Sequence, residues 1–270
     1  MKKKHIVFTG GLSILLAASL ILNAVYICQD ISKNNHTAGD EGVTVLKTNL
    51  SMTWTPGIPM EGWLIEHLKK ELGIEVWQED YPVMEGDSID CLNWLDLCCM
   101  HDAEGYYDAV REGKLKNLEN DIMKRTRFYQ RYHNAFDQIK ADTFKHTGRE
   151  GIFGVPIGLT YFNHKGYEGH CLTIPVNSSH PEQALRLIAY SATDHGIMNI
   201  TYGPEGEMWK KKNGKYVVLK NVQEIEEVDE YLEAVKGIDG MENFRTYECC
   251  LELVGNTRLG EKLVLKPPAD

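Results

Sequence analysis

The stretch EGWLIEHLKKELGIEVW at residues 61–77 decides the class of fold. Four apolar residues in its first part recur at helical spacing: Trp63, Leu64, Leu68 and Leu72. Gly73 stands where helices commonly end, and residues 74–77 form a short β-rich segment. Residues 43–50 have the composition of an earlier strand. A strand, a helix and a second strand, with a connection too long for a hairpin, predict a parallel β-α-β unit.

Helical and extended patterns alternate along the rest of the chain. Further strands are predicted at residues 94–100, 115–118, 151–157, 171–177 and 216–219. Further helices are predicted at residues 104–112, 119–140, 181–193 and 222–235. Pro156 restricts its strand to an edge or a crossing point of the sheet. This alternation predicts an α/β fold, with a mostly parallel sheet flanked by helices.

The overall charge of the chain is acidic. Its 270 residues include 29 Lys and Arg against 39 Asp and Glu, a formal net charge of −10. Hydrophobic residues make up 43% of the chain, which is too many for a disordered protein. No nucleic-acid partner is expected, because a phosphate backbone selects clustered Lys and Arg. The length suffices for one large domain or two small lobes.

The amino terminus has the pattern of an export signal. Residues 2–4 are lysines, and an uncharged, mainly apolar run follows at residues 6–27. The run is close to the ~20 residues that span a bilayer, so cleavage and retention as an anchor both stay open. Cys28 follows where a bacterial lipoprotein carries its lipid, although residues 25–27 are not the small residues expected there. We predict a signal peptide or membrane anchor at residues 1–28, with Cys28 as the candidate lipid-attachment residue.

The exported part is predicted to be an acidic domain attached to the outer face of the cell membrane. Without residues 1–28 the chain holds 26 basic and 39 acidic residues, a net charge of −13. Residues 29–42 are predicted to form a flexible tether, because the polar sequence at 32–42 has no helical or strand periodicity. The short lysine run at 210–212 is interpreted as a surface patch on a hairpin.

The cysteines indicate neither a disulfide framework nor a metal site. Cys98 and Cys99 are adjacent, as are Cys249 and Cys250, and adjacent cysteines bridge each other only with strain. No spacing matches a zinc site, so no metal and no other cofactor is predicted. Cys98 and Cys99 lie in the apolar run at 95–100 and are interpreted as buried strand thiols.

Four stretches of the exported part resemble, in the same order, segments of the extracellular solute-binding proteins of family 1. They are EHLKKELGIEVW (66–77), DAVREGKLKNLENDI (108–122), REGIFGVPIG (149–158) and a longer stretch at 174–216. The longer stretch is the most specific, because a proline-started helix, PEQALRLIAY, is followed by Tyr-Gly-Pro-Glu-Gly. Proteins of this family are the receptors of bacterial carbohydrate ABC importers, and the similarity is greatest to their Firmicute lipoprotein branch.

The resemblance implies a lobe of the periplasmic-binding-protein type at residues 43–270. Residues 43–158 and 170–219 correspond to segments of the first lobe, residues 159–169 to a short crossing, and residues 220–270 to a helical C-terminal part. Family members are longer, because a second lobe is inserted where residues 159–169 stand here. The chain is therefore predicted to be a truncated receptor with most of the second lobe missing.

The resemblance implies that the chain binds a solute for an ABC transporter, and the solute expected from this family is a carbohydrate. The implied partners are an oligosaccharide or other small solute, the permease subunits, and the membrane through the N-terminal segment. A receptor without its second lobe lacks one wall of the cleft in which such proteins hold their ligand. The alternative is therefore a truncated paralogue that does not transport and acts as a membrane-tethered protein-interaction domain.

Candidate ligand residues follow from the chemistry of sugar recognition. Aromatic rings cover the C–H faces of a sugar, and planar polar groups bind its hydroxyls. Five residues in predicted loops are expected to bind ligand on this ground, with packing or turn formation as the alternative: Trp54, Tyr161, Asn163, Tyr202 and Glu205. Trp63 and Trp94 are interpreted as core residues.

An esterase-like motif does not lead to an enzyme prediction. Gly86-Asp87-Ser88-Ile89 resembles the nucleophile motif of GDSL-type hydrolases, with Ser88 as the nucleophile. Such a serine needs a histidine base, which those hydrolases supply from an Asp-x-x-His motif near the C-terminus. No Asp-x-x-His occurs in the chain, and no histidine follows His195. The chain is predicted not to be an enzyme.

Overall fold

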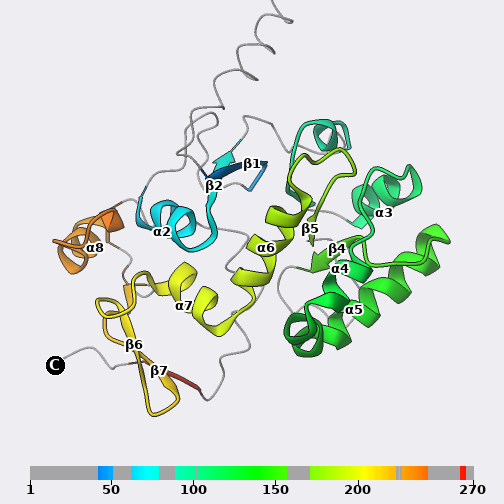
Figure 1. The fold of residues 1–270 in the computed structure, drawn as a ribbon. Coiled ribbons are helices and arrows are strands. Elements are labelled where there is room, and N and C mark those ends of the chain that lie inside the picture. The colour runs from blue at the N-terminus through cyan, green and yellow to red at the C-terminus, as the bar shows by residue number, and fades with distance from the viewer. Residues whose placement is uncertain are drawn as a thin grey trace, which may run out of the picture. The chain divides into compact units, whose positions relative to one another are not determined.

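The structure of the chain is a computed structural model (Figure 1). It describes residues 42–50, 62–78, 89–100, 103–156, 171–222, 225, 227–242 and 262–265. The chain divides into two units, Met1–Val43 and Thr44–Asp270. Every described helix and strand lies in the second unit.

The predictions for the amino terminus fall outside the described residues. They concern residues 1–28, Cys28 and all of the tether except Gly42. Within the described ranges, no helix has the length and apolar character needed to cross a bilayer. The crossing at residues 159–169 is also outside the described residues, so the predicted domain division stays a prediction.

The predicted β-α-β unit is confirmed. Strand β1 (Thr44–Thr48) pairs in parallel with strand β2 (Ile74–Gln78), and helix α2 (Trp63–Leu72) connects them. The buried residues of α2 are Leu64, Ile65, Leu68 and Leu72. Gly73 ends the helix in a left-handed conformation, with φ 64° and ψ 34°, that only glycine adopts without a steric penalty.

A second, three-stranded sheet is buried and antiparallel. Its strands in spatial order are β3 (Cys98–Met100), β5 (Cys171–Thr173) and β4 (Gly154–Pro156). A parallel bridge between Thr48 and Leu97 connects β1 to the chain that enters β3. Pro156 lies in an edge strand of this sheet, as predicted, because proline has no N–H for a second neighbour. The α/β class is confirmed, with parallel pairing in the first sheet and antiparallel pairing in the second.

The remaining elements continue the alternation of helices and strands. The helices are α3 (Ala103–Arg111), α4 (Glu119–Lys124), α5 (Thr126–Thr147), α6 (Pro181–Ser191), α7 (Asp194–Tyr202) and α8 (Val228–Ala234). A third sheet has the order β6 (Trp209–Lys212), β7 (Lys215–Val218) and β8 (Leu263–Leu265), with β6 and β7 antiparallel and β7 and β8 parallel. Figure 1 shows α7 between α6 and the β6–β7 hairpin. Helix α7 is missing from the sequence-based predictions, because nearly all of it is buried and no polar face marks its period.

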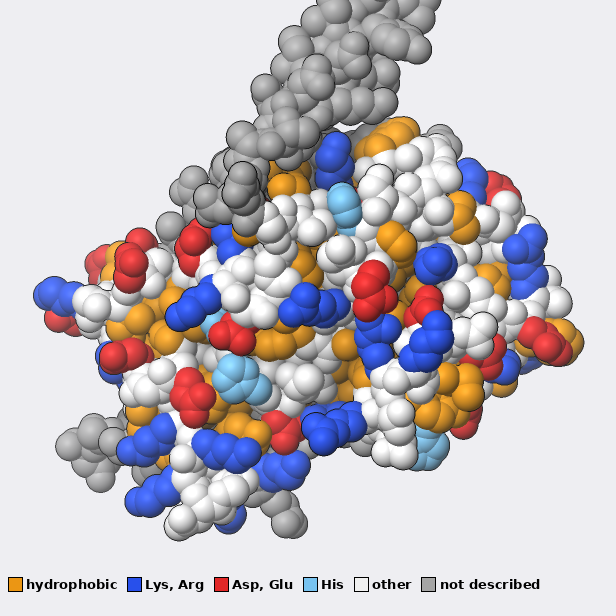
Figure 2. All heavy atoms as spheres, in the orientation of Figure 1, with side chains coloured by type: hydrophobic (Ala, Val, Ile, Leu, Met, Phe, Trp, Pro, Cys, Tyr) orange, Lys and Arg blue, Asp and Glu red, His pale blue; other side chains and the backbone are white. Residues whose placement is uncertain are grey.

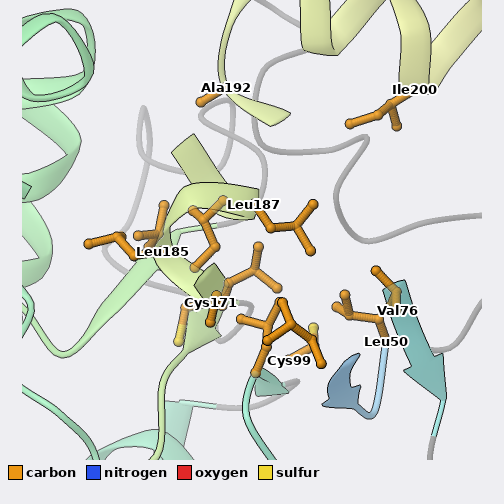
Figure 3. Packing of buried hydrophobic residues seen from close by; sticks show 14 of the residues in the cluster. Leu50, Val76, Cys99, Cys171, Leu185, Leu187, Ala192 and Ile200 are labelled. Carbon is orange, nitrogen blue, oxygen red and sulfur yellow. The ribbon is translucent and has the colours of Figure 1, made fainter. Parts of the chain in front are cut away.

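In the hydrophobic core, α6 packs against the second sheet (Figure 3). Leu185 and Leu187 of α6 lie over Cys171 of β5 and Cys99 of β3. Cys98, Cys99 and Cys171 have no exposed surface. The interpretation of Cys98 and Cys99 as buried strand thiols is therefore confirmed.

One prediction about the core is wrong. Trp94 is 44% exposed, because a 3-10 turn, η1 (Asp90–Asn93), precedes it and the strand begins only at Cys98. Trp63 is half-buried and packs against the core, so its side chain is neither a full core residue nor an exposed one. Trp63 lies at the start of α2, where it stacks on His67 in the candidate site.

Candidate ligand-binding site

The structure describes two of the five predicted ligand residues. Trp54, Tyr161 and Asn163 lie outside the described residues. Tyr202, the last residue of α7, is buried, and Glu205 is exposed in the loop before β6. Glu205 lies beside a group of polar and aromatic side chains that the sequence-based predictions did not include. This group is the candidate ligand-binding site.

Hydrogen bonds join side chains of three helices in this site. The amide Nδ2 of Asn199 on α7 donates to the hydroxyl of Tyr190 on α6 at 3.0 Å and lies 3.2 Å from Nδ1 of His195. The Tyr190 hydroxyl lies 2.7 Å from Nε2 of His67 on α2. His195 Nε2 lies 3.5 Å from a carboxylate oxygen of Glu205. These five side chains form a continuous series of polar contacts, which we name the polar chain.

Aromatic rings border the polar chain. Trp63 stacks on His67, with ring centroids 4.7 Å apart and planes inclined by 17°. Trp209 meets His195 edge-on, with centroids 5.6 Å apart. Trp209 is fully buried and its Nε1 donates to the carbonyl of Gly203 at 2.8 Å, whereas Trp63 is half-buried. Trp63 therefore retains ring surface that a ligand can cover, and Trp209 does not.

Helical spacing places these residues in pairs. Trp63 and His67 are separated by one helical turn on α2, and His195 and Asn199 by one turn on α7. Residues at this spacing share a helix face, so each helix presents two site residues together. The spacing is visible in the sequence, but it does not reveal that α2 and α7 meet.

The junction between α6 and α7 depends on Gly196. Thr193 caps α7, because its hydroxyl oxygen accepts a hydrogen bond from the Gly196 N–H at 2.9 Å. A Cβ atom at position 196 would lie 2.0 Å from the carbonyl oxygen of Tyr190. Only glycine lets the chain turn this closely, and the turn sets Tyr190 beside Asn199.

Burial sets the charge states at the centre of the polar chain. Burial lowers the pKa of His67, with an opposing effect from Glu71 and a smaller supporting effect from His195. Burial raises the pKa of Tyr190 to about 12, although the hydrogen bond from Asn199 lowers it in part. At neutral pH, His67 is therefore uncharged and accepts at Nε2 the hydrogen bond that the Tyr190 phenol donates.

The carbonyl oxygen of Asn199 is the exception in this network. The residue is 1% exposed, and its Oδ1 has no hydrogen-bond partner among the residues that the structure describes. A buried polar group without its hydrogen bond costs about 1–3 kcal/mol. Such a group in a native structure calls for an explanation, and a water or ligand that completes the hydrogen bond is one. Asn199 therefore carries an unmet hydrogen-bonding position at the centre of the polar chain.

Asp194 fixes α7 at its first turn. Its carboxylate pairs with Arg131 of α5 and lies 3.2 Å from Nζ of Lys262, beside β8. The Tyr216 hydroxyl of β7 donates to the same carboxylate at 3.5 Å. Burial acts to raise the pKa of Asp194, but hydrogen bonds and charges from Arg131 and Lys262 outweigh it and lower the pKa. The site residues of α7 are therefore held from several neighbouring elements.

The site has the chemistry of a binding site for a polar organic ligand. It combines a ring face on Trp63 with imidazole, phenol, amide and carboxylate groups, which donate to and accept from hydroxyls. Within the described ranges, no group of three His, Cys, Asp or Glu side chains is placed to hold a metal ion. The sequence-based predictions missed five site residues: Trp63, His67, Tyr190, His195 and Asn199. Only the one-turn spacings within α2 and α7 hinted at four of them, all but Tyr190.

Comparisons with known proteins give distant structural similarities. No protein-family model matches the chain, and no curated protein matches it. The N-glycan transport solute-binding protein from Streptococcus pneumoniae, in complex with Man1GlcNAc, has 11% identity and a TM-score of 0.48 over 84% of this chain and 80% of that chain. A sugar transporter from Rhizobium etli in an open conformation has 16% identity and a TM-score of 0.30, over 43% of this chain and 29% of that chain.

A third similar structure is the galacto-N-biose-/lacto-N-biose I-binding protein of the ABC transporter from Bifidobacterium longum, in complex with lacto-N-biose. It has 13% identity and a TM-score of 0.26, over 73% of this chain and 52% of that chain. At these identities and TM-scores the similarities do not decide what this chain binds.

Proposed function

We propose that the chain is a solute-binding protein that binds a carbohydrate outside the cytoplasmic membrane for an ABC transporter, without catalysis. The polar chain from His67 to Glu205, with the Trp63 ring beside it, is the observation that carries this proposal. A ring face suits the C–H surface of a sugar, and planar amide, carboxylate and imidazole groups suit its neighbouring hydroxyls.

Two stretches that resemble family 1 receptors supply the residues of this site. Residues 66–77 supply His67, and residues 174–216 supply Tyr190 and the other members of the polar chain. The two stretches are far apart in the sequence, and hydrogen bonds join them in the fold. Their meeting in one polar site supports a binding role for it.

The location and partners of the chain are part of the same proposal. We propose that residues 1–28 export or anchor the chain, with Cys28 as the lipid-attachment residue, and that residues 29–42 tether the domain outside the membrane. An oligosaccharide and the permease subunits are the proposed partners. The chain would be a truncated receptor of the Firmicute lipoprotein type, with residues 159–169 in place of the second lobe.

The alternative of a protein-interaction domain without transport is not favoured, because the polar chain suits a small hydroxylated ligand. Among the ligand residues predicted from sequence, Glu205 belongs to the polar chain and is retained in the proposal. The others stay predictions: Trp54, Tyr161, Asn163 and Tyr202.

Calorimetry on the full chain in detergent micelles, with a panel of oligosaccharides, tests the proposed function. We expect at least one oligosaccharide to bind, and Tyr190→Phe to raise its Kd roughly tenfold, because the substitution breaks the polar chain at its centre. Tyr129→Phe is the matched control, since Tyr129 is half-buried on α5 and stacks on Phe136 away from the polar chain.

Two results would contradict the proposal in different ways. The absence of binding across the whole panel argues against a carbohydrate receptor. Binding that Tyr190→Phe and Tyr129→Phe leave equally strong argues against this site, while the receptor function stands.

A further inference from the structure

The outward face of the third sheet carries a distinctive set of side chains. In the antiparallel pair, Lys210 lies opposite Val217, and Lys212 lies opposite Lys215. Val264 of β8 lies beside Val217 in the parallel pair. Because side chains alternate along a strand, all five side chains lie on one face of the sheet. We name this surface the basic sheet face.

The two faces of the sheet differ in character. Trp209, Tyr216 and Val218 lie on the other face and are buried. The three lysines of the basic sheet face are exposed, and Val264 is 37% exposed. Figure 2 shows Lys and Arg side chains gathered over the β6–β7 hairpin. Val217, at the centre of the face, is half-buried.

The charge of the basic sheet face is not neutralised locally. Several lysines elsewhere in the described residues lie within ion-pair distance of carboxylates: Lys69 of Glu75, Lys114 of Glu112, Lys140 of Glu119 and Lys236 of Glu233. Lys210, Lys212 and Lys215 have no such partner among the described residues, although the exported part is strongly acidic. Three cations without a local carboxylate partner therefore lie together on one face of the sheet.

The hairpin also places two of these three lysines directly opposite each other. Its turn residues, Asn213 and Gly214, have φ values of 52° and 75°, as a two-residue turn with the twist of the strands requires. This turn keeps Lys212 directly opposite Lys215. Like charges in that position destabilise a strand pair. An anion bound over the hairpin would relieve the repulsion.

We propose that the basic sheet face lies against the phosphate headgroups of an anionic lipid bilayer. The three lysines project from one face of the sheet, so an extended anionic surface can engage all of them together, and Val264 adds apolar contact. Each lysine near such a surface favours the bound state by roughly fivefold. The inference rests on the proposed membrane location. A flexible tether of the length of residues 29–42 would span roughly 20 Å and so keep the domain close to the bilayer.

Lysine acetylation followed by mass spectrometry tests the proposal. The full chain is placed in nanodiscs of phosphatidylcholine alone and in nanodiscs that also contain phosphatidylglycerol. We expect Lys210, Lys212 and Lys215 to react roughly fivefold or more slowly in the anionic discs, and the protection to disappear at high salt. The exposed lysines Lys124 and Lys236 are the internal references and should react alike in both discs.

A charge-matched pair of variants measures the energetic effect. The triple substitution Lys210→Gln, Lys212→Gln, Lys215→Gln should abolish the preference of the domain for anionic vesicles. The triple substitution Lys124→Gln, Lys145→Gln, Lys236→Gln removes the same charge from other exposed positions and should retain it.

Equal labelling of the hairpin lysines in the two kinds of disc overturns the proposal. Equal protection of Lys124 and Lys236 also overturns it, because the contact would then not involve this face. Protection by soluble polyglutamate but not by anionic discs would assign the face to an acidic protein instead. A chain that enters neither kind of disc contradicts the proposed anchor, and labelling with added vesicles of the two compositions then decides about the face.

Discussion

Asp96 and Asn199 are both buried polar residues, but only Asp96 has a hydrogen-bond partner for every oxygen of its side chain. Asp96 is 5% exposed, and its Oδ1 accepts hydrogen bonds from the Ser178 hydroxyl at 3.0 Å and the Ser179 N–H at 2.9 Å. Its Oδ2 accepts the N–H of Lys47 at 3.2 Å. Asn199 donates from its amide nitrogen, yet its carbonyl oxygen has no partner within the described residues.

The difference separates a residue whose hydrogen bonds build the fold from one whose carbonyl oxygen, enclosed beside the polar chain, is left without a partner. The residue before α6, His180, makes no side-chain cap, and Asp96 accepts from N–H groups at this helix start instead. A buried polar group with all its partners rigidifies the structure. Asn199 instead keeps one hydrogen-bonding position unused, in a site that also presents the Trp63 ring. Substitutions at the two positions should therefore affect different properties.

The largest effect is expected at Asp96. Asp96→Ala leaves the N–H groups at the start of α6 and the Lys47 N–H without their acceptor, and should reduce the free energy of unfolding by roughly 3 kcal/mol or more. Urea unfolding followed by circular dichroism measures the change. Asp239→Ala is the control, since Asp239 is exposed and its loss should stay within about 0.5 kcal/mol. Equal losses in the two variants would refute the structural role of Asp96.

The next largest effect is expected at Asn199, where ligand affinity should fall although stability changes less than at Asp96. Asn199→Leu removes the unpaired oxygen but also the amide donor to Tyr190, so the free energy of unfolding should fall by about 1–2 kcal/mol, less than at Asp96. Carbohydrate affinity should fall about tenfold, because Tyr190 and His195 lose the amide nitrogen that holds them in place. Urea unfolding and calorimetry on the same preparation check both values. A stability loss as large as that of Asp96→Ala, with unchanged affinity, would erase the distinction between the two residues.

A smaller, pH-dependent effect is expected at Asp194. Its pKa in the folded state is lowered from the ordinary value of 3.8, so its ion pairs contribute stability above that pH and lose it as the pH falls further. Asp194→Asn should cost about 1 kcal/mol at neutral pH and almost nothing in strong acid. Thermal unfolding of both forms across this range tests the prediction. A difference that does not change with pH would assign the effect to packing.

The smallest effect is expected at His67. Burial lowers its pKa below the ordinary value of 6.5, so the unfolded chain binds the proton first and stability declines as the pH falls below that value. His67→Gln should remove this decline. His133→Gln, at an exposed position on α5, is the control and should retain it. The same slope in all three proteins would contradict the assignment to His67.

How well a feature can be predicted from sequence depends on how far apart in the chain the residues lie that determine it. Leu64, Leu68 and Gly73 mark α2 and its end within a single stretch, so the β-α-β unit was predicted correctly. Trp94 was misplaced, because the apolar run around it continues through a 3-10 turn that no periodicity reveals. Helix α7 was missed because burial on all sides removes its polar face.

The candidate site could be predicted only in small part. Glu205 was identified because it lies in a loop that resembles a known family, and it belongs to the polar chain. His67 and Tyr190 look like ordinary surface residues of separate helices in the sequence. Their contact at 2.7 Å requires α2 and α6 to meet, which a pattern within either helix does not encode.

Local sequence was sufficient for the acidic charge, the α/β class, the burial of Cys98 and Cys99, and the β-α-β unit, because hydrophobic spacing and glycine positions act over a few residues. The polar chain, the pairing of Asp96 with the start of α6, and the basic sheet face depend on the packing of distant segments. Strand register and helix contacts result from the burial of apolar surface over the whole domain. They therefore determine which polar side chains come to lie together.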